Sequence, residues 1–290
     1  MALRADNMLL RRYVEKAMVD LPALPTVVLQ VVQATEKDTA TTTEIESMLM
    51  ADAAITTKLL KVVNSAYFGL PRQIVNVNQT IAILGMHQVR NLVMSIGVLN
   101  ALSSPSPRIM ETQKAFWQHS FASATCAEAI AKAKGLPKKD IEMIFIGGLL
   151  HDVGRLFLFT LFNLPYQEVL KESISRNEPI ESVEARILGV THAQLGGILG
   201  EKWNFPQPLI DMIQGHDAIP DGATVSEGVY CAHIADAIAN SLAPVDIVGT
   251  ASPVDVKARL WLGFTEDQYA DLKNRTAEQV SLAKEMLGVM

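Results

Sequence analysis

The sequence predicts an all-α protein. Apolar residues recur three and four positions apart along most of the 290 residues, as they do on one face of a helix. Glycine and proline stand at the breaks between these segments. Strict alternation of apolar and polar residues, which marks a half-buried strand, is rare. We therefore expect helices joined by short turns and no sheet.

The first hundred residues predict a series of short helices. An opening amphipathic helix must stop at Leu21-Pro-Ala-Leu-Pro25, because proline lacks an N–H and clashes with the preceding turn. Thr41 and Glu44 have the spacing of a capping box, and Asp52 is suited to be an N-cap. The predicted helices cover residues 6–20, 26–37, 53–65, 81–84 and 86–102.

Ser103-Ser-Pro-Ser-Pro107 is the best candidate for a linker, since two prolines and three serines in five residues cannot continue a helix. This predicts a lobe over residues 1–105 and a second lobe over residues 106–290. The alternative is a surface loop within one domain. Beyond it the predicted helices cover residues 109–134, 138–151, 155–162, 165–177, 179–188, 192–203, 208–216 and 226–242, with two or three more after Pro253.

Composition excludes several classes of protein. The net charge of -6 and the lack of any basic run longer than Lys138-Lys139 argue against DNA binding. Cys126 and Cys231 are far apart and have no CxxC spacing, so neither a disulfide framework nor a thiolate zinc site is expected. The longest apolar run, residues 156–164, is far short of the roughly 20 residues that cross a bilayer. We expect a cytoplasmic protein without a secretory signal or a membrane partner.

One apolar stretch, residues 141–161, carries an adjacent histidine and aspartate, His151-Asp152. A buried carboxylate beside an imidazole is costly unless something binds it. Either a hydrogen-bond network satisfies the pair or a metal ion does.

Further histidines and one aspartate near apolar positions or helix ends extend this pattern. Imidazole and carboxylate together suit Fe, Mn, Zn or Ni, and two neighbouring ions could polarise a phosphoryl group. Because the residues are scattered along the chain, only the fold can bring them together, and a network of core hydrogen bonds remains the alternative. The candidates are His119, His151, Asp152, His192, His216 and Asp236.

At these positions the chain resembles the HD superfamily of metal-dependent phosphohydrolases, and more closely its HDOD branch of bacterial signalling output domains. The resemblance covers residues 21–242. It implies an N-terminal helical lobe packed against an HD-like helical bundle. The segments that carry it are Leu21-Pro-Ala-Leu-Pro25, Val63-Asn-Ser-Ala-Tyr-Phe68, Ala82-Ile-Leu-Gly85, Trp117-Gln-His-Ser120, Gly148-Leu-Leu-His-Asp-Val-Gly154, Thr191-His-Ala-Gln-Leu-Gly196, Trp203, Pro206, Pro208, His216 and Ala235-Asp236.

The resemblance also implies roles for the site residues. His119, His151, Asp152 and Asp236 match the four-ligand core of HD enzymes, with Asp152 as a bridge between ions. His192 and His216 match the positions that hold a second ion in two-metal relatives. The expected cofactor is therefore one or two divalent ions (Fe, Mn, Zn or Ni), with no organic cofactor. If the protein is an enzyme, Asp152 and Arg155 are the expected catalytic residues.

Three departures distinguish this chain from the relatives that cut cyclic dinucleotides. Arg155 stands where they carry a lysine, Asp217 stands where they carry a second histidine, and their Gly-Tyr-Pro signature is missing. Arg155 can still pair with a phosphate, but as a rigid fork. Hydrolysis of cyclic dinucleotides is therefore not expected.

The sequence supports two functions of different classes. The first is a regulatory signal-transduction module, not an enzyme, that acts through contacts with a signalling protein partner and can carry a metal. The second is a metal-dependent phosphohydrolase acting on a nucleotide or phosphate ester. A sensor that binds a nucleotide or phosphate ligand without cutting it would differ from the enzyme by showing stabilisation without product.

Overall fold

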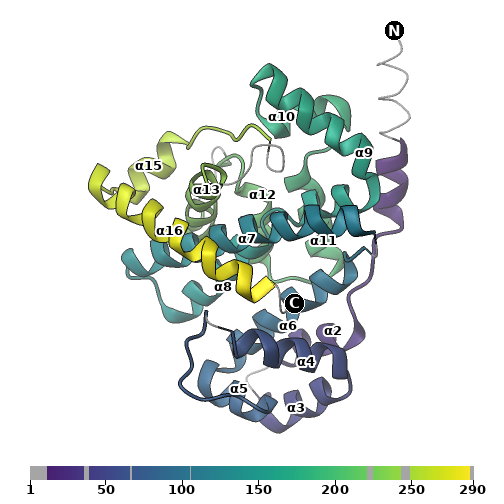
Figure 1. Cartoon of the computed structure of the whole chain (residues 1–290), viewed down its shortest axis with the longest axis vertical. Helices are drawn as coiled ribbons and strands as arrows, with labels where there is room; N and C mark the ends of the chain where they lie inside the picture. Colours follow the sequence, from purple (N-terminus) through teal and green to yellow (C-terminus); the bar gives the residue numbers. More distant parts are fainter. Residues whose placement is uncertain are drawn as a thin grey trace.

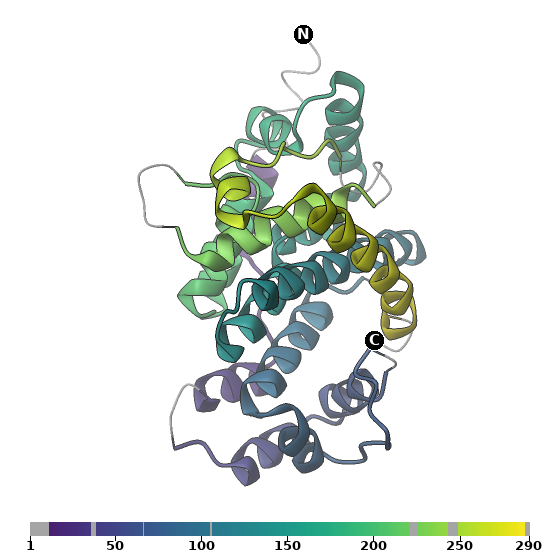
Figure 2. The same ribbon diagram turned by 90° about the vertical axis from the view of Figure 1, so that its left-hand side faces the viewer.

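The computed structural model describes residues 12–35, 39–65, 67–104, 106–220, 225–242 and 249–287. Throughout these ranges the regular structure is helical, without a strand, so the predicted all-α class is confirmed. Figures 1 and 2 show a smaller group of helices at the lower end of the molecule and a larger bundle above it.

We call the smaller group the first lobe and the larger bundle the second. Local signals in the sequence set the helix starts of the smaller group. Thr41 Oγ1 accepts a hydrogen bond from the Glu44 N–H, and Asp52 Oδ1 accepts from the N–H groups of Ala54 and Ile55. Asp52 is thus confirmed as an N-cap, and Thr41 makes one of the two hydrogen bonds of the predicted capping box. The helices are α2 (Thr26–Thr35), α3 (Thr42–Met50), α4 (Ala53–Val63), α5 (Val77–Leu84) and α6 (Met86–Ala101).

Helix α6 joins the first lobe to the bundle. Every residue from Val89 to Val98 is buried, so this helix is enclosed on all sides. It packs on α2, α4 and α5 on one side and on α8 of the bundle on the other. Asn91 Nδ2 donates to the Glu142 carbonyl of α8 at 3.3 Å.

The larger bundle forms the second lobe, and its central helices α7, α8 and α13 pack closely on one another. The predicted linker is the short connection between α6 and α7. The helices of the bundle are α7 (Pro107–Ala133), α8 (Lys138–Leu150), α9 (Val153–Arg176), α10 (Ile180–Ile187), α11 (His192–Lys202), α12 (Gln207–Gly215), α13 (Glu227–Asn240), α15 (Val256–Leu262) and α16 (Glu266–Leu287).

Helix α9 consists of two helices that meet at a kink at Phe162, where φ is -124° and ψ is 32°. The two helices expected over residues 155–162 and 165–177 are thus confirmed, and the first of them begins slightly earlier, at Val153. Pro165 lies inside the element, and the kink accommodates its missing N–H and its ring.

The run from α8 through α9, Lys138–Arg176, is long and apolar enough to cross a membrane, and α5 with α6 would form a second such span if counted across their 119° bend. However, 89% of the most apolar window of the first run is buried inside the protein. Its hydrophobicity is that of a core helix.

The chain segment before α2 lies against the second lobe. The Trp203 indole N–H donates to the Pro22 carbonyl at 2.8 Å, and Lys202 Nζ donates to the Leu21 carbonyl at 3.0 Å. Figure 1 shows the N-terminal helix beside α9 and α11, away from α3 to α5. The chain therefore starts on the bundle, passes into the first lobe and returns.

Candidate metal centre

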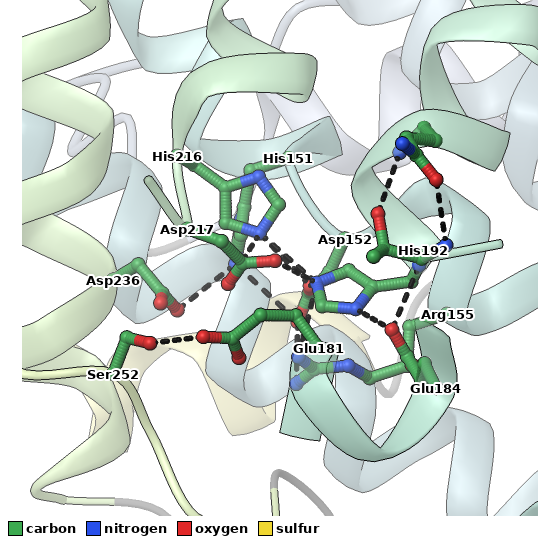
Figure 3. Close-up of polar contacts among 12 residues, drawn as sticks. His151, Asp152, Arg155, Glu181, Glu184, His192, His216, Asp217, Asp236 and Ser252 are labelled. Carbon is green, nitrogen blue, oxygen red and sulfur yellow. Dashed lines mark hydrogen bonds and ion pairs between the residues drawn. The ribbon is translucent and has the colours of Figure 1, made fainter. Parts of the chain in front are cut away.

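The structure brings all six predicted site residues together in the middle of the bundle. Figure 3 shows five of them with their side chains gathered at one point, namely His151, Asp152, His192, His216 and Asp236. Five segments that are far apart in the sequence supply the six residues. The contributions are His119 from α7, His151 and Asp152 from the junction of α8 and α9, His192 from the start of α11, His216 from the end of α12 and Asp236 from α13.

The junction of α8 and α9 places His151 and Asp152. His151 ends α8 and Asp152 is the N-cap position of α9, and the two are 0% and 1% exposed. A Cβ on Gly148 would lie 2.7 Å from the Ala124 Cα, so the backbones of α7 and α8 approach closely here. This approach brings His119 beside His151.

The first half of the centre has the donor set of a metal site. Asp236 Oδ1 lies 3.1 Å from the Nε2 atoms of both His119 and His151, which are 3.3 Å apart. Asp152 Oδ2 lies 3.4 Å from His151 Nε2 and 3.6 Å from His119 Nε2. Each of the four residues offers one nitrogen or oxygen atom, and these four atoms all lie within 4.8 Å of one another.

The second half of the centre uses the other oxygen of Asp152. Asp152 Oδ1 lies 3.1 Å from His192 Nε2 and 3.4 Å from His216 Nε2, and the two nitrogens are 3.2 Å apart. Asp152 thus faces both groups of histidines, which is the position expected of a bridging carboxylate.

The second nitrogen of three imidazoles is fixed by an acceptor. His151 Nδ1 donates to the Gly148 carbonyl at 2.7 Å, and His216 Nδ1 donates to the Ile213 carbonyl at 2.8 Å. His192 Nδ1 donates to Glu184 Oε2 at 2.7 Å. Because Nδ1 carries the proton, each ring directs Nε2 at the centre, as metal-ligating histidines do.

The charges at the centre show what holds it together. Burial lowers the pKa of His151, but Asp152 and Asp236 outweigh burial and raise that pKa to about 10. Burial raises the pKa of Asp152, but Arg155 and His151 hold it well below its usual value. A proton on His151 Nε2 therefore balances these carboxylates, and a divalent ion in its place would satisfy the same acceptors. The residues present fit such an ion.

Arg155 forms a buried ion pair with Asp152. Its Nη1 lies 3.0 Å from Asp152 Oδ2, and its side chain is 3% exposed. Burial lowers its pKa, but Asp152 outweighs burial and raises it. The contact with a phosphate oxygen that an enzyme would need stays a prediction.

Sequence reasoning missed two carboxylates of the centre. Asp217, read only as a departure from the relatives, places Oδ2 2.9 Å from His192 Nε2 and Oδ1 3.5 Å from His216 Nε2. Its adjacency to His216 repeats the His-Asp pairing at 151–152, and that repeat was the available signal. Glu184 is 0% exposed on α10, and nothing in its local sequence indicates that it reaches His192.

His87 and His233 lie outside the set of candidate ligands. His233 is buried and has a structural role, since its Nδ1 donates to the His216 carbonyl at 2.7 Å and its Nε2 accepts from the Asp255 N–H at 2.9 Å. His87 is half-buried at the start of α6.

Comparison with known proteins identifies the family. The HDOD domain matches residues 21–219, which is more than half of the chain. The chain belongs to the HDOD family. The sequence resemblance to HDOD domains is thereby confirmed.

One relative of this HDOD protein is a much longer protein. An uncharacterized protein of Treponema pallidum (strain Nichols) is 30% identical over 205 residues, which are 69% of this chain and 38% of that protein. The chain thus spans well under half the length of this relative.

Solved structures share the fold of this HDOD protein. A "Putative phosphohydrolase" of Shewanella amazonensis SB2B has a TM-score of 0.72 at 20% identity, covering 94% of this chain and 96% of that one. An HDOD domain protein with unknown function from Geobacter sulfurreducens has a TM-score of 0.70 at 20% identity, covering 97% and 98%. At these identities the likeness shows the fold alone.

Proposed function

We propose that this HDOD protein is a regulatory signal-transduction module that binds a divalent metal ion in its core and acts through contacts with a protein partner. The burial of the centre is the observation that carries this proposal. The side chains of His151, His192 and His216 are 0% exposed and that of Asp152 is 1% exposed. Only Asp236 and Asp217, at 11% and 10%, extend toward solvent.

Such burial is better suited to an ion that stabilises the fold than to an ion that must reach a substrate. A divalent ion held by His119, His151, Asp152 and Asp236 would supply positive charge in place of the proton on His151. It would also link α7, the α8–α9 junction and α13, which pack on one another. Loading the site could then change the stability of the bundle, and through α6 that of the first lobe.

A cavity between the lobes supports the part of the proposal that concerns a partner. The cavity has a volume of about 630 Å³ and lies where α5 and α6 meet α7, α8 and α16. Its lining is mixed, with the aromatic rings of Tyr67 and Phe68 beside the charged groups of Lys138 and Arg275. Apolar rings next to exposed charges are typical of surfaces that bind other proteins.

The alternative is a metal-dependent phosphohydrolase acting on a nucleotide or phosphate ester. The two histidine groups that share Asp152 favour this alternative, because such a donor set can hold ions that polarise a phosphoryl group. Glu181 lies at the edge of the centre, where Ser252 Oγ donates to it. A carboxyl there could exchange a proton with a bound ester.

Elemental analysis of the purified protein, combined with a screen of phosphodiesterase and nucleotidase substrates, separates these functions. The module predicts near-stoichiometric Fe, Mn, Zn or Ni without turnover, and loss of the metal in Asp152→Ala. The matched control is His87→Ala, which removes a histidine outside the centre and should keep the metal. Turnover that disappears in Asp152→Ala would establish the enzyme instead. Wild-type protein that contains no metal would contradict both proposed functions.

A further inference from the structure

The second half of the metal centre contains a fixed positive charge. Arg155 Nη2 lies 3.1 Å from His192 Nε2, while its Nη1 lies 3.0 Å from Asp152 Oδ2. The guanidinium therefore contacts His192, which would have to bind a second ion, and the Oδ2 atom of the shared carboxylate, which faces the first half.

This charge cannot be removed by titration or by a small movement. An arginine side chain stays protonated in proteins, so it can only donate to its neighbours. Arg155 is 3% exposed, and the negative groups near it are Asp152, Glu184 and Asp217. These charges favour a cation at this point, and the side chain supplies it.

The nitrogen of His192 has no free lone pair for a metal. If its Nε2 is unprotonated, that lone pair accepts from the Arg155 N–H. If it is protonated, it forms ion pairs with Asp217 Oδ2 at 2.9 Å and Asp152 Oδ1 at 3.1 Å. In both states an incoming divalent ion would approach a guanidinium whose nitrogen is 3.1 Å from the intended ligand.

We infer that the Arg155 guanidinium takes the place of a second metal ion, so that the centre accepts one divalent ion, on His119, His151, Asp152 and Asp236. His192, His216 and Asp217 then serve to hold Arg155 and Asp152 in position. This inference rests on the proposed metal binding. It differs from the two-ion arrangement that the sequence resemblance implies for His192 and His216.

Titration of the metal-free protein with Mn²⁺, followed by calorimetry and by elemental analysis of the desalted complex, tests the inference. We expect one ion per chain in the wild type and two in Arg155→Gln, which keeps a polar side chain of similar length without the charge. The control Arg186→Gln removes an exposed arginine that pairs with Glu172 and Glu178, and should bind one ion.

Each other stoichiometry has a defined meaning. Two ions in the wild type would overturn the inference and leave metal binding intact. One ion in a folded Arg155→Gln protein would show that Arg155 does not exclude the second ion. No ion in the wild type would overturn the proposed metal binding itself.

A second pair of variants keeps the inference testable if Arg155→Gln does not fold. His151→Ala removes a predicted ligand and should weaken Mn²⁺ binding at least 100-fold. His192→Ala removes a residue that positions Arg155 and Asp152 without binding the ion, and should keep one ion with affinity within about 10-fold of the wild type, in line with the effect of groups behind the ligands. Equal losses in the two variants would contradict the one-ion arrangement.

Discussion

Glu184 accepts two hydrogen bonds from His192, one from the backbone N–H at 2.8 Å and one from Nδ1 at 2.7 Å. The Tyr166 hydroxyl donates to the other oxygen of the same carboxylate. One buried side chain of α10 therefore fixes both the start of α11 and the orientation of an imidazole at the metal centre.

Replacing Glu184 with alanine should destabilise the protein by about 3–5 kcal/mol, because it leaves buried donors on His192 and Tyr166 without an acceptor. Urea unfolding followed by circular dichroism measures the change. Glu168→Ala is the matched control, since Glu168 forms an exposed ion pair with Lys171 and should contribute less than about 1 kcal/mol. A loss of similar size in both variants would contradict the role given to Glu184.

Metal binding should stabilise the folded protein. At a concentration of Mn²⁺ one hundred times its dissociation constant, the free energy of unfolding should rise by about 2.7 kcal/mol. Thermal melts with and without a chelator measure this difference. Asp236→Asn should reduce it strongly, since Asp236 contacts both His119 and His151. A chelator-insensitive melting temperature would contradict the prediction.

The metal-free protein should lose stability as the pH rises from about 7 to 10. The folded pKa of His151, about 10, exceeds the value of about 6.5 for an unfolded histidine. Its contribution is therefore fully present below pH 6.5 and is lost as the pH rises through the folded pKa. Unfolding at several pH values should show a smaller loss in His151→Gln. With metal bound the histidines carry no proton on Nε2, so metal affinity should instead increase with pH.

Gly154→Ala should disrupt the metal centre, although Gly154 is not one of the candidate ligands. A Cβ at this position would lie 2.0 Å from the His192 carbonyl oxygen and 2.7 Å from the Gly196 N, which are backbone atoms of α11. Helix α9 would have to move away from α11, and we expect a loss of more than about 3 kcal/mol and weaker metal binding. Gly200→Ala is the control, because its nearest neighbour is a side-chain atom of Ile210 at 3.1 Å.

The sequence was most informative where a local signal coincided with a structural requirement. The six predicted site residues converge, and Gly148 and Gly154 of the motif around His151 allow the close helix contacts that bring them together. Glu184 could not be predicted, because its contact with His192 depends on how α10 packs. Neither the metal nor the roles of Asp152 and Arg155 in catalysis follow from the geometry alone, so they stay predictions.

The start of the last helix shows why similar patterns can differ in meaning. A threonine followed three residues later by a glutamine, a pattern that can start a helix, occurs at Thr276. The structure uses an earlier copy of the same pattern, in which Gln268 N–H donates to Thr265 Oγ1 and Thr265 N–H donates to Gln268 Oε1. Thr276 is instead buried inside α16, where its hydroxyl donates to the Leu272 carbonyl. The helix therefore begins after Thr265, because Thr276 is buried within it.

The hydrogen bond from Trp203 to Pro22 has a consequence for dissecting the molecule. A fragment that starts at residue 106 would retain the Trp203 indole but lose the Pro22 carbonyl that accepts its hydrogen bond. Leu21 and Leu24 would also be missing from the core. Cutting at the serine-rich connection therefore separates the sequence into halves without separating two self-sufficient units. An excised bundle should be less soluble than the intact chain, and adding residues 12–25 back at its N-terminus should restore part of what is lost.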